Sequence, residues 1–538
     1  MKYKRFFPIL ALLSAFVVSG CGATQPSSSA EPSRDSSPST SEPSTSSSED
    51  KTSSPSSSSS SSVSTSSNGS TSSSSSSSSS SAQQSSSSSS SSSSSAPVKE
   101  YFKTDIAVQL DPGIKEAPEG ETLTPYNLSF KFDDEYFLSD PKEYNKDLSM
   151  LSLGASIATG DETGGNAFLN AAEFKDISAH DYDVTPTKDT MGYFMAHKTI
   201  DEYELVTVSF RGFNYAMEWA NNFQIGKTGD HEGFAARGAE AYAAFKTYVS
   251  SYASGKSLKV WINGYSRAGA LSNVLASLIL RNNELPITQD NMFVYTFEAP
   301  ASLDEPNALP YANVHNINNQ ADLITFIPPA EYSLYRCGVD YLIYDPNVST
   351  IMKAFDPDTT IPEFQETDDL GTTVASDFEL RDLLLNSIFN KEIEEGESTE
   401  ACANTREQYV DNYQTGLSNA IGYVFAMKAS TRAAMLEDLQ ADIFTALIVI
   451  GDETGAALAD FMKTYLDRDG IVYDAESLQA DCAILIKGVQ NLFLTLLSSF
   501  VGDGAAKNDL TRLLDMHYPE TTYVLLKYTH EKPTDVIK

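Results

Sequence analysis

The segment that most constrains the fold is 261–270, which reads WINGYSRAGA. It joins an apolar, β-branched run at 258–262 to an amphipathic helical pattern, so a strand is expected to run directly into a helix. A serine at the apex of such a turn is lifted out of the sheet when the residues two before and two after it are small. Gly264 and Ala268 hold these positions, with alanine where glycine is usual. The segment therefore predicts a nucleophile, Ser266, lifted out of the sheet toward a base.

The sequence around this turn predicts an α/β fold. Short runs rich in β-branched and aromatic residues have the length of buried strands. Helical patterns lie between them, at 234–252 and 269–280. This alternation of strands and helices predicts a mainly parallel sheet flanked by helices. The four strand runs are 205–210, 258–262, 292–297 and 313–317.

Several blocks in this region resemble the class 3 (fungal-type) lipases, which have the α/β-hydrolase fold. The stretch 208–213, VSFRGF, is similar to the strand and FRG[ST] block of that family, and 231–234, HEGF, is similar to its H-x-G-F block. The resemblance implies that the backbone amides of Phe213 and Arg267 receive the oxyanion. Phe213 stands where the family has threonine or serine, so only its backbone N–H can contribute. Trp219 stands at a position where members of the family often have a tryptophan near their lid.

The acid of the expected triad is assigned through the same resemblance. In this fold the three groups follow one another in the order serine, aspartate, histidine. The stretch 318–329, NNQADLITFIPP, follows the predicted strand 313–317 and resembles the N-x-x-D-x-(V/I)-x-x-(L/I)-P-P stretch of the family. Asp322 matches its triad aspartate. Without this match, an aspartate in such a loop is more simply interpreted as a solvated carboxylate.

The base must be a histidine that follows the serine in the chain. His315 lies inside a predicted strand, which leaves His517 and His530. His517 follows a short amphipathic helix and opens a loop before an apolar segment, whereas His530 lies in a charged tail. The sequence therefore favours His517. The histidines that precede the serine are His180, His197 and His231.

The chain beyond Asp356 has a different character. Strand signals fade, apolar residues recur at helical spacing, and the region 356–505 is predicted to be a helical insertion that caps the site. The apolar stretch 484–500 is interrupted by polar residues, so a buried helix is expected rather than a membrane span. The hydrolase core then comprises 97–355 and 506–538. An aromatic and methionine face at Met217, Trp219 and Phe223 fits either a lid or ordinary core packing.

The N-terminus has the features of a secretory signal. A basic start is followed by an apolar run at 6–18 that is too short to span a bilayer. The sequence Val-Ser-Gly-Cys that ends at Cys21 resembles the bacterial lipobox. This resemblance implies that 1–20 is a lipoprotein signal peptide and that Cys21 carries two acyl chains, enough for stable anchoring. The alternative is a plain secretory signal near an unrelated cysteine.

Residues 21–96, which begin with the lipidated Cys21, are mostly serine with some proline and threonine. Such a composition buries little apolar surface and stays disordered, so a flexible tether is expected. The chain is therefore expected outside the cytoplasm, attached by lipid to a bacterial cell membrane of the Gram-positive type.

The net charge and the cysteine pattern limit the kinds of partner, metal and cofactor that this chain is expected to bind. The formal net charge of −36 opposes binding to nucleic acid. The cysteines lack C-x-x-C spacing, and no HExxH motif exists, so neither a metal site nor a cofactor is expected. Cys402 and Cys482 lie in one predicted helical region and could form a disulfide, which the sequence leaves open.

These features lead to one expected function and two alternatives. The expected function is hydrolysis of lipid or short-chain carboxylic esters through an acyl-enzyme, with an ester as the partner substrate. The first alternative is a catalytically silent hydrolase fold that serves as a surface binding lipoprotein. The second is an esterase that removes acyl groups from polysaccharide.

Overall fold

The computed structural model describes the elements that surround the candidate site. Its described residues are 99–112, 124–184, 186–213, 216–344, 405–428, 451–487, 516–528 and 534–536, with isolated positions between 378 and 449. All of the helices and strands belong to the compact unit that contains Tyr101–Lys538. The expected signal peptide, the expected lipidation site Cys21 and the serine-rich stretch expected to be a tether lie outside the described residues, as do His530 and Cys402.

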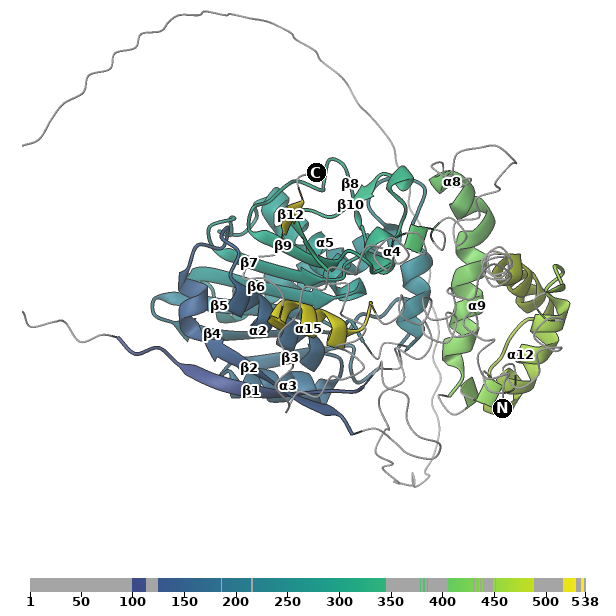
Figure 1. Ribbon diagram of the computed structural model, residues 1–538, viewed down its shortest axis with the longest axis horizontal. Coiled ribbons are helices and arrows are strands. Elements are labelled where there is room, and N and C mark those ends of the chain that lie inside the picture. The colour runs from purple at the N-terminus through teal and green to yellow at the C-terminus, as the bar shows by residue number, and fades with distance from the viewer. Residues whose placement is uncertain are drawn as a thin grey trace, which may run out of the picture. The chain divides into compact units, whose positions relative to one another are not determined.

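The centre of the molecule is an eight-stranded sheet in the order β12-β11-β9-β7-β6-β5-β4-β3 (Figure 1). The strands from β5 to β11 in this order run parallel, whereas β3, β4 and β12 pair antiparallel with their neighbours. The predicted α/β-hydrolase fold with a mainly parallel sheet is thus confirmed. The strands are β3 (Lys175–His180), β4 (Tyr193–Ile200), β5 (Tyr203–Phe210), β6 (Ser257–Tyr265), β7 (Met292–Phe297), β9 (Val314–Asn319), β11 (Val339–Ile343) and β12 (Thr534–Val536).

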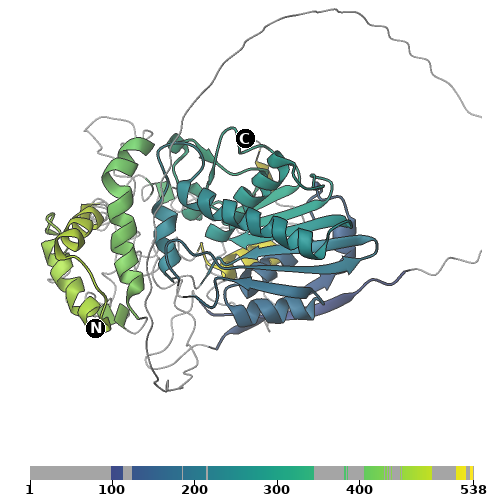
Figure 2. The same ribbon diagram turned by 180° about the vertical axis from the view of Figure 1, so that it is seen from behind.

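The two faces of the sheet are covered by different elements (Figures 1 and 2). Side chains alternate along β6: Val260 and Ile262 pack into the core with α4 (Glu232–Tyr252) and α5 (Arg267–Asn282). Trp261 and Tyr265 pack into the core on the other face. That face is covered by the hairpin β1 (Lys103–Leu110) and β2 (Tyr126–Asp133) and by α2 (Lys146–Ala158), α3 (Glu162–Ala171) and α15 (Pro519–Tyr528).

The register of the parallel strands brings their carboxyl ends to one edge. Tyr265 at the end of β6 is level with Phe297 at the end of β7, and Phe297 is level with Ile317 of β9. Loops that follow neighbouring parallel strands form the binding crevice of open α/β sheets. The segments after β5, β6, β7 and β9 therefore meet at this edge.

The described part of the region 356–505 is mainly helical, as predicted, and its role as an insertion that caps the site stays a prediction. It contains α8 (Arg406–Tyr409), the π-helical turn η6 (Val410–Gln414), α9 (Thr415–Ala426) and α12 (Ala456–Asp469). None of the helices among the described residues combines the length and apolar character of a membrane span. The apolar stretch 484–500 is described only as far as residue 487, so most of it lies outside the described residues.

The helical region packs against a short 3-10 helix of the core, η2 (Ala216–Phe223). Ser418 Oγ on α9 donates to the carbonyl of Ala220 at 2.9 Å, and Arg406 Nε donates to the carbonyl of Gly226 at 2.7 Å. Trp219 is buried in a cluster with Leu323 and apolar residues of α9 and α12. At Trp219, the face predicted to form either a lid or core packing is therefore buried against the helical region. The side chain of Met217 lies outside the described residues.

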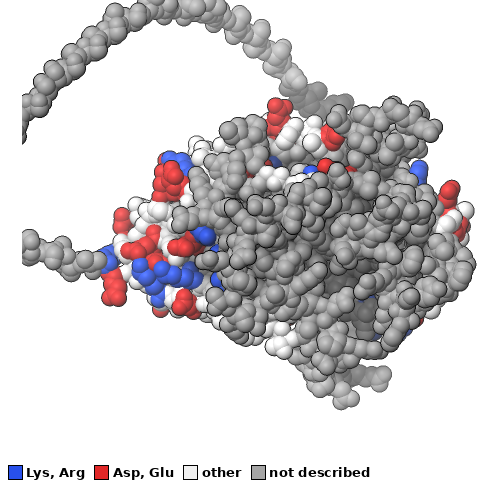
Figure 3. All heavy atoms as spheres, viewed as in Figure 1, with Lys and Arg blue, Asp and Glu red and all other residues white. Residues whose placement is uncertain are grey.

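The described surface carries mixed charges. On the face shown in Figure 3, acidic and basic side chains lie interspersed. Lys103 of β1, for example, pairs with the exposed Glu135. Exposed pairs of this kind contribute little to stability.

Candidate active site

Ser266 lies at a sharp turn between β6 and α5. Its φ of 57° and ψ of −127° place it in the left-handed half of the backbone map, which side chains rarely adopt outside strained sites. A Cβ atom on Gly264 would lie 2.3 Å from the carbonyl oxygen of Ala268, so this position accepts only glycine. Ala268 itself is completely buried. The chain therefore adopts the strand–serine–helix turn with alanine at the second small position.

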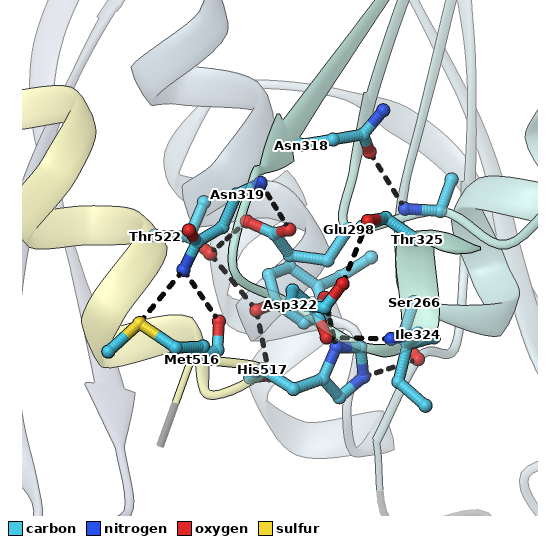
Figure 4. Close-up of polar contacts among 12 residues, drawn as sticks. Ser266, Glu298, Asn318, Asn319, Asp322, Ile324, Thr325, Met516, His517 and Thr522 are labelled. Atoms are coloured by element: carbon cyan, nitrogen blue, oxygen red, sulfur yellow. Dashed lines mark hydrogen bonds and ion pairs between the residues drawn. The ribbon is translucent and has the colours of Figure 1, made fainter. Parts of the chain in front are cut away.

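Ser266, His517 and Asp322 form a continuous chain of hydrogen bonds (Figure 4). The distance from Ser266 Oγ to His517 Nε2 is 2.9 Å, and that from His517 Nδ1 to Asp322 Oδ2 is 2.7 Å. The second oxygen of Asp322, Oδ1, accepts from the amide of Ile324 at 2.9 Å. The structure thus brings together the three residues that the sequence assigned to the triad.

The loop that carries His517 is anchored to two strand ends. Asn319 Nδ2 at the end of β9 donates to the carbonyl of Met516 at 3.1 Å, and the Tyr265 hydroxyl donates to the carbonyl of His517 at 2.9 Å. Asp322 is completely buried, Ser266 is 7% exposed and the His517 side chain is 24% exposed. The carboxylate is therefore shielded from solvent, the serine is nearly so, and the His517 side chain is partly exposed.

The loop after β5 lies directly against the serine turn. A Cβ atom on Gly212 would lie 2.3 Å from the carbonyl oxygen of Tyr265, the residue before Ser266. The ring of Phe213 packs on the Tyr265 ring with centroids 4.9 Å apart. Arg267 opens α5, whose N-terminal amides favour negative charge. The structure therefore places both predicted oxyanion residues beside Ser266, and the role of their amides stays a prediction.

Replacing Gly212 with alanine is expected to push the Phe213 amide away from Ser266, because the added methyl group collides with the Tyr265 carbonyl. Loss of one oxyanion donor lowers kcat by about 100- to 1,000-fold. Steady-state hydrolysis of a chromogenic ester measures the effect. Gly451→Ala is the control, because a Cβ atom there has no neighbour within 4 Å. A kcat for Gly212→Ala equal to that of the control would remove this loop from the oxyanion site.

A buried carboxylate that the sequence analysis did not single out links these two segments. Glu218 on η2 is completely buried; its Oε1 lies 2.5 Å from Arg211 Nη2, and its Oε2 lies 2.7 Å from Arg267 Nη1. Arg211 directly precedes the Gly212–Phe213 loop, and Arg267 directly follows the serine. Glu218 therefore ties η2 to both sides of the predicted oxyanion site.

Two other described histidines, His231 and His315, are buried and serve the fold. His231 is buried at the start of α4, where Nδ1 accepts from the amide of Phe234 and Nε2 lies 3.2 Å from the carbonyl of Asn222. Burial lowers the pKa of His231 to about 3, so it stays neutral. His315 is enclosed by the rings of Tyr144, Tyr295 and Tyr341. His315 is thus a core residue of its strand, as expected.

The two described cysteines are buried. Cys482 is a free thiol buried beside the Met462 sulfur, at 3.7 Å, and burial raises its pKa to about 12. Cys337 is also buried and contacts Asn273. The described ranges contain no cluster of histidine, cysteine, aspartate and glutamate that could hold a metal ion.

Comparison with known proteins matches this site to one family. The family model described as lipase (class 3) matches residues 207–332. Over this segment the chain is similar to class 3 lipases. The matched segment contains Phe213, Ser266, Arg267 and Asp322 and ends before His517.

Individual lipases share a modest part of the sequence. The lipase of Rhizomucor miehei is 25% identical over 167 residues, which are 28% of this chain and 45% of that protein. The chain thus spans less than half the length of this relative. The solved triacylglyceride lipase of Rhizomucor miehei is 19% identical, with a TM-score of 0.29 over 37% of this chain and 80% of that one. The lipase of Rhizopus microsporus var. chinensis is 16% identical, with a TM-score of 0.29 over 37% and 75% of the two chains.

Proposed function

We propose that this protein is a serine ester hydrolase, a lipase or esterase, that acts through an acyl-enzyme. The observation that carries the proposal is the unbroken chain of hydrogen bonds from Ser266 through His517 to Asp322 at a strained turn. A nucleophile, a base and an orienting acid in this order are the requirements of acyl transfer.

The reaction follows from the positions of these groups. His517 Nε2 takes the proton from Ser266 Oγ, which attacks the ester carbonyl carbon. The amides of Phe213 and Arg267 hold the negative oxygen of the tetrahedral intermediate. His517 then protonates the departing alcohol, and an acyl-serine remains. Water, deprotonated by His517, attacks this ester, and the carboxylic acid leaves as Ser266 recovers its proton.

The proposed substrates are lipid or short-chain carboxylic esters outside the cytoplasm. The similarity to class 3 lipases over 207–332 supports an ester substrate. The lipobox-like sequence that ends at Cys21 and the serine-rich stretch after it support a lipid anchor and a tether. A tethered enzyme would reach substrates near the membrane surface while remaining attached to the cell.

A fluorophosphonate probe tests the proposal on the full chain in detergent. We expect a single covalent adduct, located by mass spectrometry on Ser266 and lost in both Ser266→Ala and His517→Ala. Ser209→Ala, which removes a buried hydroxyl on β5, is the matched control and should still be labelled. A folded wild-type protein that takes up no probe, with or without detergent, would contradict the enzyme and favour a binding protein.

A further inference from the structure

A second buried carboxyl group lies behind the proposed triad. Glu298 directly follows β7, the strand between β6, which leads to Ser266, and β9, which leads to Asp322. It is completely buried, and its φ of 48° lies in the left-handed region that favours glycine. A polar side chain that combines burial with backbone strain must be held by strong specific contacts.

Those contacts join the two loops that carry the base and the acid (Figure 4). Glu298 Oε2 accepts from the amide of Asn319 at 2.6 Å, three residues before Asp322. Glu298 Oε1 accepts from Thr522 Oγ1 on α15 at 2.7 Å. The Glu298 and Asp322 carboxyl groups are also close enough to influence each other electrostatically.

The network continues to the backbone of the base. Thr522 Oγ1 lies 3.1 Å from the Tyr265 hydroxyl, which donates to the carbonyl of His517. Glu298 is therefore connected to Asp322 on one side and, through Thr522 and Tyr265, to His517 on the other. Removal of its carboxyl group would loosen both connections.

The charges around Glu298 determine whether its carboxyl group is protonated. Two buried carboxyl groups in contact do not both ionise, because their like charges repel. Burial and the neighbouring Asp322 raise the pKa of Glu298 well above its ordinary value. The other titratable groups that face this cluster are His517 before α15, Tyr265 on β6 and Glu520 on α15. No lysine or arginine in the described part of the chain forms an ion pair with Glu298, so the neutral acid is favoured.

We propose that Glu298 is a positioning residue of the triad, a neutral carboxylic acid that donates a hydrogen bond to Asp322 and holds the Asp322 and His517 loops together. The proposal rests on the function proposed for Ser266, Asp322 and His517. With Glu298 neutral, the buried pair presents a single negative charge to the imidazolium that forms at His517. If Glu298 were ionised, the buried pair would carry two negative charges and the hydrogen bond from Glu298 to Asp322 would be lost.

Two substitutions separate this role from simple packing. Glu298→Gln keeps the shape and provides an amide N–H that can donate to Asp322, while the Thr522 hydroxyl can rotate to accept. We expect its kcat to stay close to that of the wild type. Glu298→Gly removes the carboxyl group at a position whose backbone suits glycine. We expect its kcat to fall by about 100-fold with little change in KM, because the base and acid lose their alignment.

Infrared spectroscopy of the full chain at neutral pH tests the protonation directly. We expect the carbonyl stretch of a protonated carboxylic acid in the wild type, its loss in Glu298→Gln, and its retention in Glu305→Gln, which alters an exposed glutamate. Absence of the band from the wild type, or an equal loss of kcat in Glu298→Gln and Glu298→Gly, would overturn the proposal. The band does not depend on turnover, so failure of the fluorophosphonate reaction would count against the proposed function separately.

Discussion

Replacing Asp322 with asparagine is expected to lower kcat by about four orders of magnitude and to leave KM and the fold nearly unchanged. Asp322 accepts the Nδ1 proton of His517, which keeps Nε2 free to take the proton of Ser266. An asparagine can turn its amide N–H toward Nδ1 and stabilise the wrong tautomer, and that change alone costs about 10⁴ in kcat in serine proteases.

Steady-state kinetics of ester hydrolysis and circular dichroism together measure this result. Asp183→Asn, which alters an exposed aspartate far along the chain from the triad, is the matched control and should keep its activity. If Asp322→Asn retained more than a tenth of the wild-type kcat, Asp322 would not be the residue that orients His517.

The second large effect is expected on stability. Glu218→Gln removes the charge that neutralises Arg211 and Arg267, both of which are buried. Breaking a buried pair by removing one partner costs about 3–5 kcal/mol, because the remaining charges stay in the protein interior. The free energy of unfolding, measured by urea titration, should fall by that amount.

A surface pair provides the control for this measurement. Glu240→Gln breaks the pair that Glu240 forms with Arg237 on α4, where the glutamate side chain is 59% exposed. Exposed pairs contribute about 0–1 kcal/mol, so this variant should unfold near the wild-type midpoint. If Glu218→Gln and Glu240→Gln lowered the free energy of unfolding equally, Glu218 would not stabilise the interior as its contacts indicate.

Much of the parallel centre of the sheet could be predicted from the sequence because β5, β6 and β7 are buried along most of their length and contain runs of apolar and β-branched residues. The predicted runs lie within β5, β6 and β7, and 313–317 overlaps β9. Strands buried on both faces give such continuous runs. The predicted helices 234–252 and 269–280 correspond to α4 and α5.

The antiparallel strands were missed for two physical reasons. In β1 and β2 buried and exposed residues alternate, because one face of the hairpin meets the core, so no continuous run appears. In β4 the buried residues include His197 and Lys198, which resemble surface residues in the sequence. Their partners, Glu204 and Asp134, become neighbours only when the sheet and the segment after β2 assemble.

In the candidate site too, a feature that depends on residues adjacent in the chain could be predicted, whereas features that depend on residues far apart in the sequence could not. Ser266 could be predicted because the residues of its turn are adjacent in the chain, and family resemblance added Asp322, Phe213 and much of the case for His517. Neither a local motif nor a block of family resemblance marked Glu218 or Glu298 in the sequence. Their importance comes from contacts with residues far away in the sequence and, for Glu298, from a backbone angle that the residue type does not reveal.

The hydrogen bond between Ser266 and His517 also has a consequence for biosynthesis. It joins residues 251 positions apart and closes only after α15 has docked, with Tyr523, Val524 and Leu525 entering the core. Contacts between such distant residues form late in folding, because the entropy of closing a long loop opposes them. A chain in which the segment with His517 and α15 is not yet made or not yet docked therefore holds the serine without its base, so hydrolytic power would arise only after this segment has docked.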